Sequence, residues 1–138
     1  MIDLGHGTGK GVLAACLMHP FESCRGIEIL ENLQNQSVKL KKCYESFVDE
    51  MDEAKYKSLF RMEKCKAPGF NVRLGDIITD DWSDADFIIA NSTCFSEGLM
   101  QAMAKSSAKC KKGSWFVTLT KRLPTADDNL VTKSGDAR

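Results

Sequence analysis

Short apolar runs alternate along this chain with longer segments in which apolar residues recur at helical intervals. The run at residues 2–4 predicts the end of a buried strand, and the apolar stretch at residues 12–18 predicts a helix that packs on it. Four glycines spaced by two separate them, in "MIDLGHGTGKG", which indicates a strand-to-helix turn. A second strand is expected around residues 25–27, and it ends in Glu28.

A long mixed segment follows this second strand. From residue 30 to about 64, apolar residues recur at mostly helical intervals among many charges without an interrupting proline, which predicts one long helix or two consecutive helices. The "APG" at residues 67–69 ends it, "FNVRL" predicts a third strand, and "GDIITDDWSD" predicts a loop that begins at Gly75 and Asp76.

The last third of the chain repeats the alternation. "ADFIIAN" predicts a buried strand that ends at Asn91, residues 97–112 predict a helix whose Leu99, Met100 and Met103 face inward, and "GSWFVTLT" predicts another strand. The remainder is loop-like, with at most one short strand at residues 129–133. Strands that alternate with helices predict an α/β fold with a doubly wound, mostly parallel sheet, whose ligands bind beyond the carboxyl ends of the strands.

Length and composition are typical of one globular domain. The chain has 138 residues, 43% of them hydrophobic, which favours a single domain over residues 1–138. No apolar run approaches the roughly 20 residues of a membrane helix, and the N-terminus does not resemble a secretion signal. We therefore expect a nuclear or cytoplasmic protein with no membrane contact.

Charge weakens the simplest argument for nucleic-acid binding, because the formal net charge is zero. The charges are nevertheless unevenly distributed: every charged residue at positions 76–97 is acidic, and every charged residue at positions 105–122 is basic. One face or end of the protein is therefore expected to be locally positive.

The six cysteines do not indicate a metal site. None forms a CxxC pair and the chain has only two histidines, so we expect no bound metal and interpret the cysteines as free thiols, most of them buried. Cys94 has no histidine near it in sequence and its neighbours suggest burial, which argues against a nucleophilic role.

The glycine turn favours a nucleotide-type ligand, because glycine lets the backbone approach closely and the N–H groups at a helix start attract polar atoms. A P-loop is excluded, since Lys10 is followed by Gly11 and the position five before Gly9 is Leu4. A nicotinamide dinucleotide site stays open, because Gly5 and Gly7 loosely satisfy GxGxxG and Glu28 lies about 20 residues on.

Three carboxylates separate these alternatives. Asp3, Glu28 and Asp76 stand at the carboxyl ends of consecutive predicted strands, and with the glycine turn they resemble the class I S-adenosylmethionine-dependent methyltransferases, which have a Rossmann-like fold. S-adenosylmethionine carries a sulfonium, an ammonium, a ribose diol and an adenine amino group, so carboxylate acceptors suit it where they would repel a phosphate. The alternative is that Glu28 and Asp76 only end strands as solvated or turn residues.

The resemblance implies a role for each site residue. Glu28 takes the ribose hydroxyls, Asp76 or the backbone of Ile77 meets the adenine, and Asp3 supports the glycine loop or the methionine moiety. His6 contacts the cofactor or is a surface loop histidine. The cofactor-binding set that this implies is Asp3, Gly5, His6, Gly7, Thr8, Gly9, Glu28, Ile29, Asp76, Ile77 and Asn91.

A more specific resemblance lies further on. "GDIITDDW", "ADFIIANSTCF" and "KKGSWFVTLTKRLP" resemble the nucleosomal histone-lysine methyltransferases named for disruptor of telomeric silencing, the Dot-one family. The matching positions are Asp80, Asp81, Trp82, Asn91 and Phe95.

That resemblance implies histone-lysine methylation in the nucleus by a chromatin regulator, by direct in-line methyl transfer. It makes Asn91 and Phe95 the catalytic residues: Asn91 orients the amine or the cofactor, and Phe95 forms an apolar channel wall. Two plainer interpretations remain, in which Asn91 caps the turn after its strand and Phe95 belongs to the core.

The chain also departs from the family pattern. Ser92 stands where the family usually has a second asparagine, and Thr93 where it has an aromatic residue. The family's domain begins upstream of the glycine strand with a lid, and a class I sheet usually ends in a hairpin, so we expect a chain truncated at both ends.

The resemblance also bears on partners and on alternative functions. Histones or nucleosomes are the implied substrate, with Lys105, Lys109, Lys111 and Lys112 contacting nucleosomal DNA or forming a solvated helix face. Three alternatives stay open: a non-catalytic cofactor-binding or interaction module, a methyltransferase of this fold with another acceptor, and a nicotinamide oxidoreductase.

Overall fold

The structure, a computed structural model, describes residues 1–60 and 67–125. The elements follow in the order β1 (Ile2–Leu4), α1 (Lys10–Met18), β2 (Ser23–Glu28), α2 (Glu31–Asp49), α3 (Glu53–Phe60), β3 (Gly69–Leu74), β4 (Phe87–Asn91), the 3-10 helix η1 (Ser92–Cys94), α4 (Glu97–Ser107) and β5 (Trp115–Leu119). The predicted α/β alternation is confirmed.

The five strands form one sheet in the order β3-β2-β1-β4-β5. All the described pairings are parallel, with Asp3 of β1 opposite Gly26 of β2 and Ile89 of β4. The chain winds outward from β1 through β2 to β3 and then returns to the other side of β1 for β4 and β5. The order therefore reverses between β1 and β4, and in open α/β sheets ligands bind beyond the strand ends at such a point.

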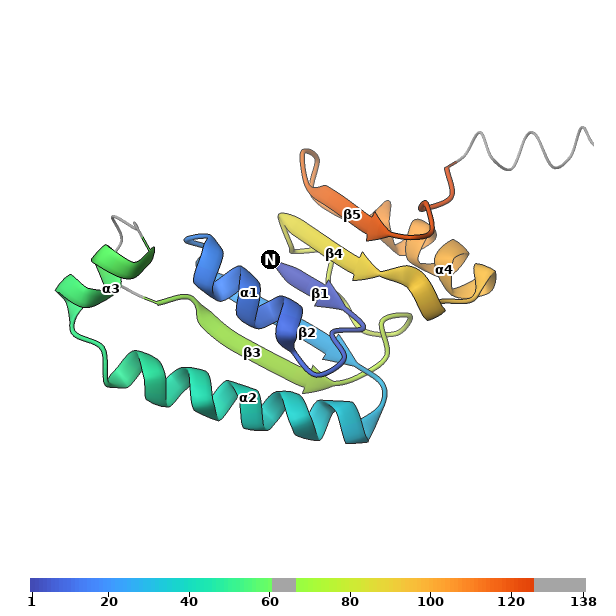
Figure 1. The fold of residues 1–138 in the computed structure, drawn as a ribbon. Coiled ribbons are helices and arrows are strands. Elements are labelled where there is room, and N and C mark those ends of the chain that lie inside the picture. The colour runs from blue at the N-terminus through green and yellow to red at the C-terminus, as the bar shows by residue number, and fades with distance from the viewer. Residues whose placement is uncertain (61–66, 126–138) are drawn as a thin grey trace, which may run out of the picture.

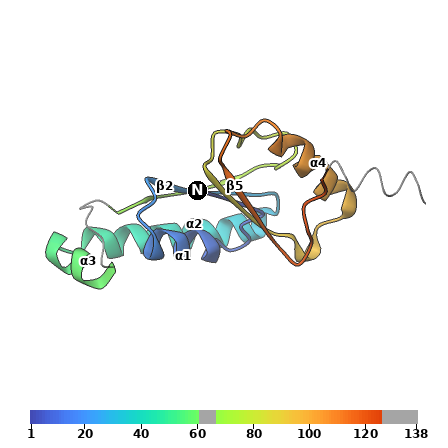
Figure 2. The same cartoon turned by 90° about the horizontal axis from the view of Figure 1, so that it is seen from above.

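Helices lie on both faces of the sheet (Figures 1 and 2). α1 and α2 cover one face over β1, β2 and β3, and α4 lies on the opposite face beside β4 and β5. Because side chains alternate along a strand, Ile2 and Leu4 enter the core on the α4 face, and Asp3 between them points to the α1 face. A second core on the α1 face contains Val12, Cys16, Cys24, Tyr44 and Phe70.

The predicted segment from residue 30 to 64 forms two helices rather than one. The N–H of Met51 bonds to the carbonyl of Val48 at 3.1 Å, which closes α2 with a short turn. The carboxylate of Asp52 then accepts the N–H of Lys55 at 2.7 Å and so satisfies a free donor at the start of α3. The predicted helical residues 61–64 lie outside the described residues.

The prediction of a helix to residue 112 is wrong at its end. α4 ends at Ser107, and the N–H groups of Lys109 and Cys110 bond three residues back, to Ser106 and Ser107 at 3.0 Å each. Gly113 then turns the chain into β5 with a φ of 93°. Short-range turns replace the helix here because the chain must reverse to reach β5. The expected strand at 129–133 falls outside the described residues.

The cysteines are free thiols where they are described, but the prediction that most are buried is wrong. Cys16 and Cys24 are buried and Cys110 is half-buried, whereas Cys43 and Cys94 are exposed. Cys94 ends η1 at the edge of the sheet, where core residues do not cover it. Among the described helices, none has both the length and the apolar character to cross a membrane.

Candidate functional site

The glycine turn between β1 and α1 is held by backbone hydrogen bonds. The N–H groups of Gly5 and His6 both donate to the carbonyl of Ile27 in β2, at 2.9 and 3.2 Å, and the N–H of Gly9 donates to the carbonyl of His6 at 2.9 Å. The three glycines at positions 5, 7 and 9 have φ values of 75°, 58° and 84°. Side chains other than glycine rarely adopt this conformation, which explains the glycine spacing. Thr8 is half-buried within the turn.

Glu28 ties the end of β2 to this turn. Its Oε2 accepts the N–H of Gly7 at 2.8 Å and its Oε1 accepts the N–H of Leu30 at 2.9 Å. The residue is only 5% exposed, whereas Ile29 beside it is 64% exposed. Glu28 is therefore a turn-organising residue as well as a strand-end carboxylate. Each carboxylate oxygen has a further lone pair with which it can accept a ligand hydroxyl.

Asp3 lies under the start of α1 with its charge largely desolvated. The residue is 7% exposed, and a Cβ added at Gly11 would come within 2.5 Å of its Oδ2. Burial, together with the charge of Glu28, raises the pKa of Asp3 to about 6. A cationic group that reached this carboxylate would therefore gain more than it would from an exposed one.

His6 is buried beneath the turn, so the surface-loop interpretation is wrong. The residue is 5% exposed, and its Nε2 lies 3.0 Å from Oε1 of Gln34 in α2. The hydroxyl of Ser37 donates to the carbonyl of Gln34 at 2.8 Å. Sequence reasoning missed Gln34 and Ser37. They are three residues apart, and this spacing places them on the same side of the helix as its apolar residues. That pattern could have indicated two polar side chains that face the core.

The GD turn stands at the same edge of the sheet. The N–H of Gly75 donates to the carbonyl of Glu28 at 2.9 Å, and the carboxylate of Asp76 accepts the N–H of Ile78 at 2.8 Å. Ile77 is buried and its carbonyl accepts the indole N–H of Trp82 at 2.9 Å. Ile78 is instead 51% exposed. Sequence reasoning missed Ile78, which presents apolar surface beside Asp76.

Asn91 and Phe95 follow β4 at this edge. Asn91 is exposed and precedes η1, but its side chain makes no capping hydrogen bond to the backbone; its Oδ1 accepts the hydroxyl of Thr93 at 2.8 Å. Phe95 is half-buried and packs against the α4 core. A Cβ added at Gly5 would lie 2.8 Å from Cζ of Phe95, so the ring lies directly against the glycine turn.

Ser92 and Lys121 fix this segment to the end of β5, and sequence reasoning missed both. The fully buried hydroxyl of Ser92 donates to the carbonyl of Leu119 at 2.5 Å and accepts the N–H of Lys121 at 3.1 Å. The ammonium of Lys121 bonds to the carbonyl of Phe95. Thr120, between Leu119 and Lys121 in the sequence, has a φ of 77°, an unusual conformation for a non-glycine residue.

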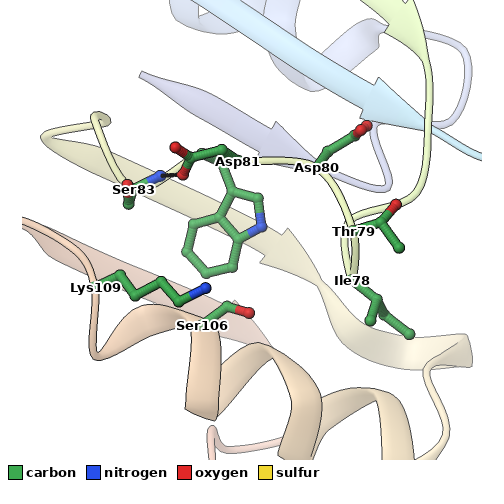
Figure 3. A pocket seen from close by; sticks show the side chains of 8 residues that line it. Ile78, Thr79, Asp80, Asp81, Ser83, Ser106 and Lys109 are labelled. Atoms are coloured by element: carbon green, nitrogen blue, oxygen red, sulfur yellow. Dashed lines mark hydrogen bonds between the residues drawn. The ribbon is translucent and has the colours of Figure 1, made fainter.

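A separate pocket of about 220 Å³ lies between the loop at residues 78–83 and the end of α4 (Figure 3). Lys109 and Ser106 border it from the α4 side, opposite Asp81, whose carboxylate accepts the N–H of Ser83 at 3.0 Å. The lining contains none of the predicted catalytic or cofactor-binding residues. This pocket is therefore distinct from the site at the glycine turn.

The four basic residues proposed to contact DNA are all exposed, and one of them is in an ion pair. Lys105 lies in the last turn of α4, Lys109 and Lys112 follow the helix in the exposed connection to β5, and Lys111 pairs with Asp86 at 3.2 Å. Within residues 1–60 and 67–125, no group of three or more His, Cys, Asp or Glu side chains is arranged to hold a metal ion.

The carboxyl edge of the sheet thus brings together residues that the sequence separates by up to 90 positions. A hydrogen bond to its carboxylate joins Glu28 to the glycine turn, a backbone hydrogen bond joins Glu28 to the GD turn, and the ring of Phe95 lies against the glycine turn. Such a site offers carboxylate acceptors, glycine backbone and one aromatic wall, which suits a ligand that is polar and partly cationic.

Comparison with solved structures shows the same fold in several proteins. The chain matches the PH0226 protein from Pyrococcus horikoshii OT3 (TM-score 0.57, 19% identity), covering 85% of this chain and 46% of that one. It also matches the methyltransferase domain of bacterial CtHen1 (TM-score 0.51, 18% identity, 77% and 48% covered). A third match is a protein associated with the conversion of a disulfide bond into a thioacetal group during echinomycin biosynthesis (TM-score 0.56, 15% identity, 84% and 41% covered). The chain thus spans less than half of each of these proteins.

At the level of sequence, no curated protein matches the chain significantly. A family profile does match: the one described as "Histone methylation protein DOT1", over residues 1–136.

Proposed function

The chain belongs to the DOT1 family of histone methylation proteins, and we propose that it transfers a methyl group from S-adenosylmethionine to a histone lysine. Its α/β sheet has the Rossmann-like fold of class I methyltransferases. We further propose that residues 1–138 form a single S-adenosylmethionine-binding domain.

The observation that carries this proposal is the set of three carboxylates at the carboxyl edge of the sheet, beside the glycine turn. Asp3, Glu28 and Asp76 stand at or near the carboxyl ends of β1, β2 and β3. A dinucleotide or a nucleoside triphosphate brings phosphates, which these charges repel, whereas S-adenosylmethionine brings cations and hydroxyl donors. Glu28 alone would also suit the ribose of a nicotinamide dinucleotide, but the three acceptors together fit S-adenosylmethionine better.

Each residue of the site has a proposed role in holding the cofactor. Glu28 accepts the ribose hydroxyls with the lone pairs that Gly7 and Leu30 leave available, and Asp3 attracts the cationic methionine moiety. Asp76 and the backbone of Ile77 meet the adenine. The turn residues Gly5, His6, Gly7, Thr8 and Gly9, together with Ile29 and Asn91, complete the proposed binding set.

The protein's own part in the reaction is alignment and exclusion of water. When bound, S-adenosylmethionine supplies a methyl group on a positively charged sulfur. The attacking lysine amine must be neutral, and its ordinary pKa near 10.4 means that an apolar channel helps by disfavouring the ammonium. We propose that Phe95 provides an apolar wall of this channel and that Asn91 orients the amine or the cofactor.

Histones are the proposed substrate, and the nucleus the proposed location, because the family is one of histone methylation proteins. Contact with nucleosomal DNA is proposed for Lys105, Lys109 and Lys112, which lie along the exposed end of α4 and the connection to β5. Lys111 joins this group only if it leaves Asp86.

The test is calorimetric titration with S-adenosylhomocysteine and, separately, with reduced nicotinamide dinucleotide. We expect micromolar binding of the first and none of the second. Glu28→Gln is expected to weaken binding at least tenfold, since it removes a charge-assisted acceptor from a buried site. Glu31→Gln is the matched control, because Glu31 is exposed three residues away at the start of α2.

Two outcomes of these measurements would contradict the proposal. Equal affinity of Glu28→Gln and the unaltered chain for S-adenosylhomocysteine would show that the Glu28 carboxylate does not bind the cofactor. Binding of the dinucleotide alone would favour an oxidoreductase. A methylation assay on nucleosomes, free histones and small amines then identifies the acceptor. Label on small amines alone would favour a methyltransferase of this fold with another substrate.

A further inference from the structure

A compact group of buried polar side chains lies under the glycine turn, on the α1 face of the sheet. Within residues 1–60 and 67–125, the buried polar residues are Asp3, His6, Glu28, Gln34, Ser37 and Ser92. All except Ser92 belong to this group. Buried polar groups are costly unless they are satisfied, so a concentration of them beside a ligand site points to a role in that site.

His6 is the group member whose hydrogen bonding is incomplete. Its Nε2 bonds to Gln34 at 3.0 Å, but its Nδ1 is buried and has no hydrogen-bond partner among the described residues. The ring is also enclosed: a Cβ added at Gly26 of β2 would lie 2.5 Å from its Cδ2. The imidazole therefore has a fixed orientation, and one ring nitrogen can gain or lose a proton without breaking the Gln34 contact.

The charge of Glu28 in β2 acts on this ring, and Asp3 of β1 is buried on the same face of the sheet. From α2, the ring contacts the uncharged Gln34, which also bonds to Ser37. On α1, Lys10 is exposed. Burial lowers the pKa of His6 from its ordinary value of 6.5, against smaller opposing effects of the Gln34 hydrogen bond and the Glu28 charge. Burial thus favours the uncharged ring at neutral pH, and without a proton on His6 no positive charge opposes the negative charge beneath the turn.

We propose that the charge state of His6 sets the preference of the glycine turn for the positively charged methyl donor over its uncharged-sulfur product. This inference rests on the proposed function. S-adenosylmethionine and S-adenosylhomocysteine differ only by a methyl group and one positive charge, so the ratio of their affinities reports the electrostatic potential at the sulfur. A proton on His6 adds a positive charge beneath the turn and opposes the sulfonium. Neutral His6, held by Gln34, leaves the site selective for the donor.

The test measures both dissociation constants by calorimetry between pH 5.5 and 8 at constant ionic strength. The donor-to-product affinity ratio is expected to fall about thirtyfold on acidification: about tenfold from the charge on His6, the order of effect for unit charges about 10 Å apart at an effective dielectric constant of about 20, and about threefold from Asp3. His6→Gln retains a side-chain N–H for Gln34 but cannot titrate in this range. In this variant the fall is expected to shrink to about threefold, the part that Asp3 contributes as it titrates.

The chain offers a matched control, because its other histidine, His19, is exposed. His19→Gln is expected to keep the full fall in the ratio. Circular dichroism and thermal unfolding check that both variants fold. If His6→Gln does not fold, the affinity ratio is followed in Gln34→Leu. Loss of the Gln34 hydrogen bond, which raises the pKa of His6, is expected to move the midpoint of the fall in this ratio to lower pH.

Nitrogen NMR of labelled histidine on the free protein tests the proton itself. We expect His6 to be neutral at pH 7, with its proton on Nε2, and to titrate below pH 6.5. A protonated His6 at pH 7, or an identical ratio profile in His6→Gln and the unaltered chain, would overturn this inference while leaving the proposed function intact. Failure of the folded chain to bind either molecule at any pH would overturn both.

Discussion

The two buried carboxylates at the glycine turn differ in what balances their charge. Glu28 accepts two backbone N–H groups, at 2.8 and 2.9 Å. Asp3 is the one whose pKa is raised, to about 6, by burial and by Glu28. An ionised Asp3 therefore destabilises the folded chain at neutral pH, and a site that retains such a residue gives up stability for ligand binding.

Replacing Asp3 by asparagine separates these two effects. The folded-state pKa of about 6 lies above the ordinary value of 3.8, so the contribution of Asp3 to stability is greatest below pH 3.8 and is lost as the pH rises through 6. The stability of Asp3→Asn relative to the unaltered chain is therefore expected to rise by about 2 kcal/mol between pH 4.5 and pH 7.5. Binding of S-adenosylmethionine should weaken at the same time.

Urea denaturation at the two pH values measures this difference, and titration with the donor measures the loss of binding. Asp49→Asn serves as the control, because Asp49 is exposed at the end of α2. If the difference in unfolding free energy between Asp3→Asn and the unaltered chain does not change with pH, Asp3 is not the titrating group.

Residue types in the site could be predicted from sequence, but their surroundings could not. The strand-end positions of Glu28 and Asp76 follow from local patterns, as does the glycine spacing. The burial of His6 depends on Gly26 and on α2, which are 20 and more residues away in the chain. A lone histidine in a glycine turn carries no local sign of which way its ring points.

At the scale of elements, the connection from β4 to α4 depends on one serine. The buried hydroxyl of Ser92 joins η1 to the end of β5, and Phe95 three residues on lies against Gly5. The position of the proposed channel wall is thus set by a contact between two segments that lie 27 residues apart in the chain.

Ser92→Ala is expected to cost about 1 kcal/mol, because it removes the hydrogen bonds that its buried hydroxyl makes to Leu119 and Lys121, whose backbone groups still bond to each other. It should also weaken S-adenosylhomocysteine binding, since Phe95 loses its support against the glycine turn. Chemical denaturation and calorimetry measure the two effects. Ser58→Ala, at an exposed position of α3, is the control and is expected to change neither. Unchanged stability of Ser92→Ala would contradict a stabilising role for the hydrogen bonds of Ser92 to Leu119 and Lys121.

Whether a segment is a helix or a strand was predictable, because the spacing of its apolar residues differs between the two. Where some of these elements end was not predictable. The alternation of apolar runs predicted all five described strands. The helix expected to reach residue 112 ends at Ser107, because the chain must turn toward β5, and no local signal marks that requirement. The division between α2 and α3 was left open by the periodicity alone.

At the scale of the whole molecule, two strands of the sheet carry none of the described helices on one of their faces. α1 and α2 cover β1, β2 and β3, while no described helix covers β4 and β5 on that side (Figures 1 and 2). Phe87 and Ile89 of β4 stand beside Trp115 and Val117 of β5 on this face. Trp115 is 70% exposed, although parallel sheets are usually covered on both faces.

The two tryptophans are therefore expected to behave in opposite ways. Trp82 is 1% exposed and donates its indole N–H to Ile77, so Trp82→Phe should cost about 1–3 kcal/mol. Trp115→Phe should change stability by less than about 0.5 kcal/mol. Acrylamide quenching distinguishes them: Trp82→Phe should keep strongly quenched emission, and Trp115→Phe should lose it. Similar quenching in both variants would contradict this exposure difference.

The sequence by itself determined the alternation of strands and helices, the place of the glycine turn, and the carboxylates at the strand ends. These follow from side-chain period, from the steric freedom of glycine and from the rule that ligands bind at the carboxyl edge of a parallel sheet. Only the tertiary structure decided that His6 is buried against Gln34, that Glu28 also holds the turn, and that Phe95 lies on Gly5. Desolvation and hydrogen bonding depend on which distant residues surround a group, and that information exists only once the chain has folded.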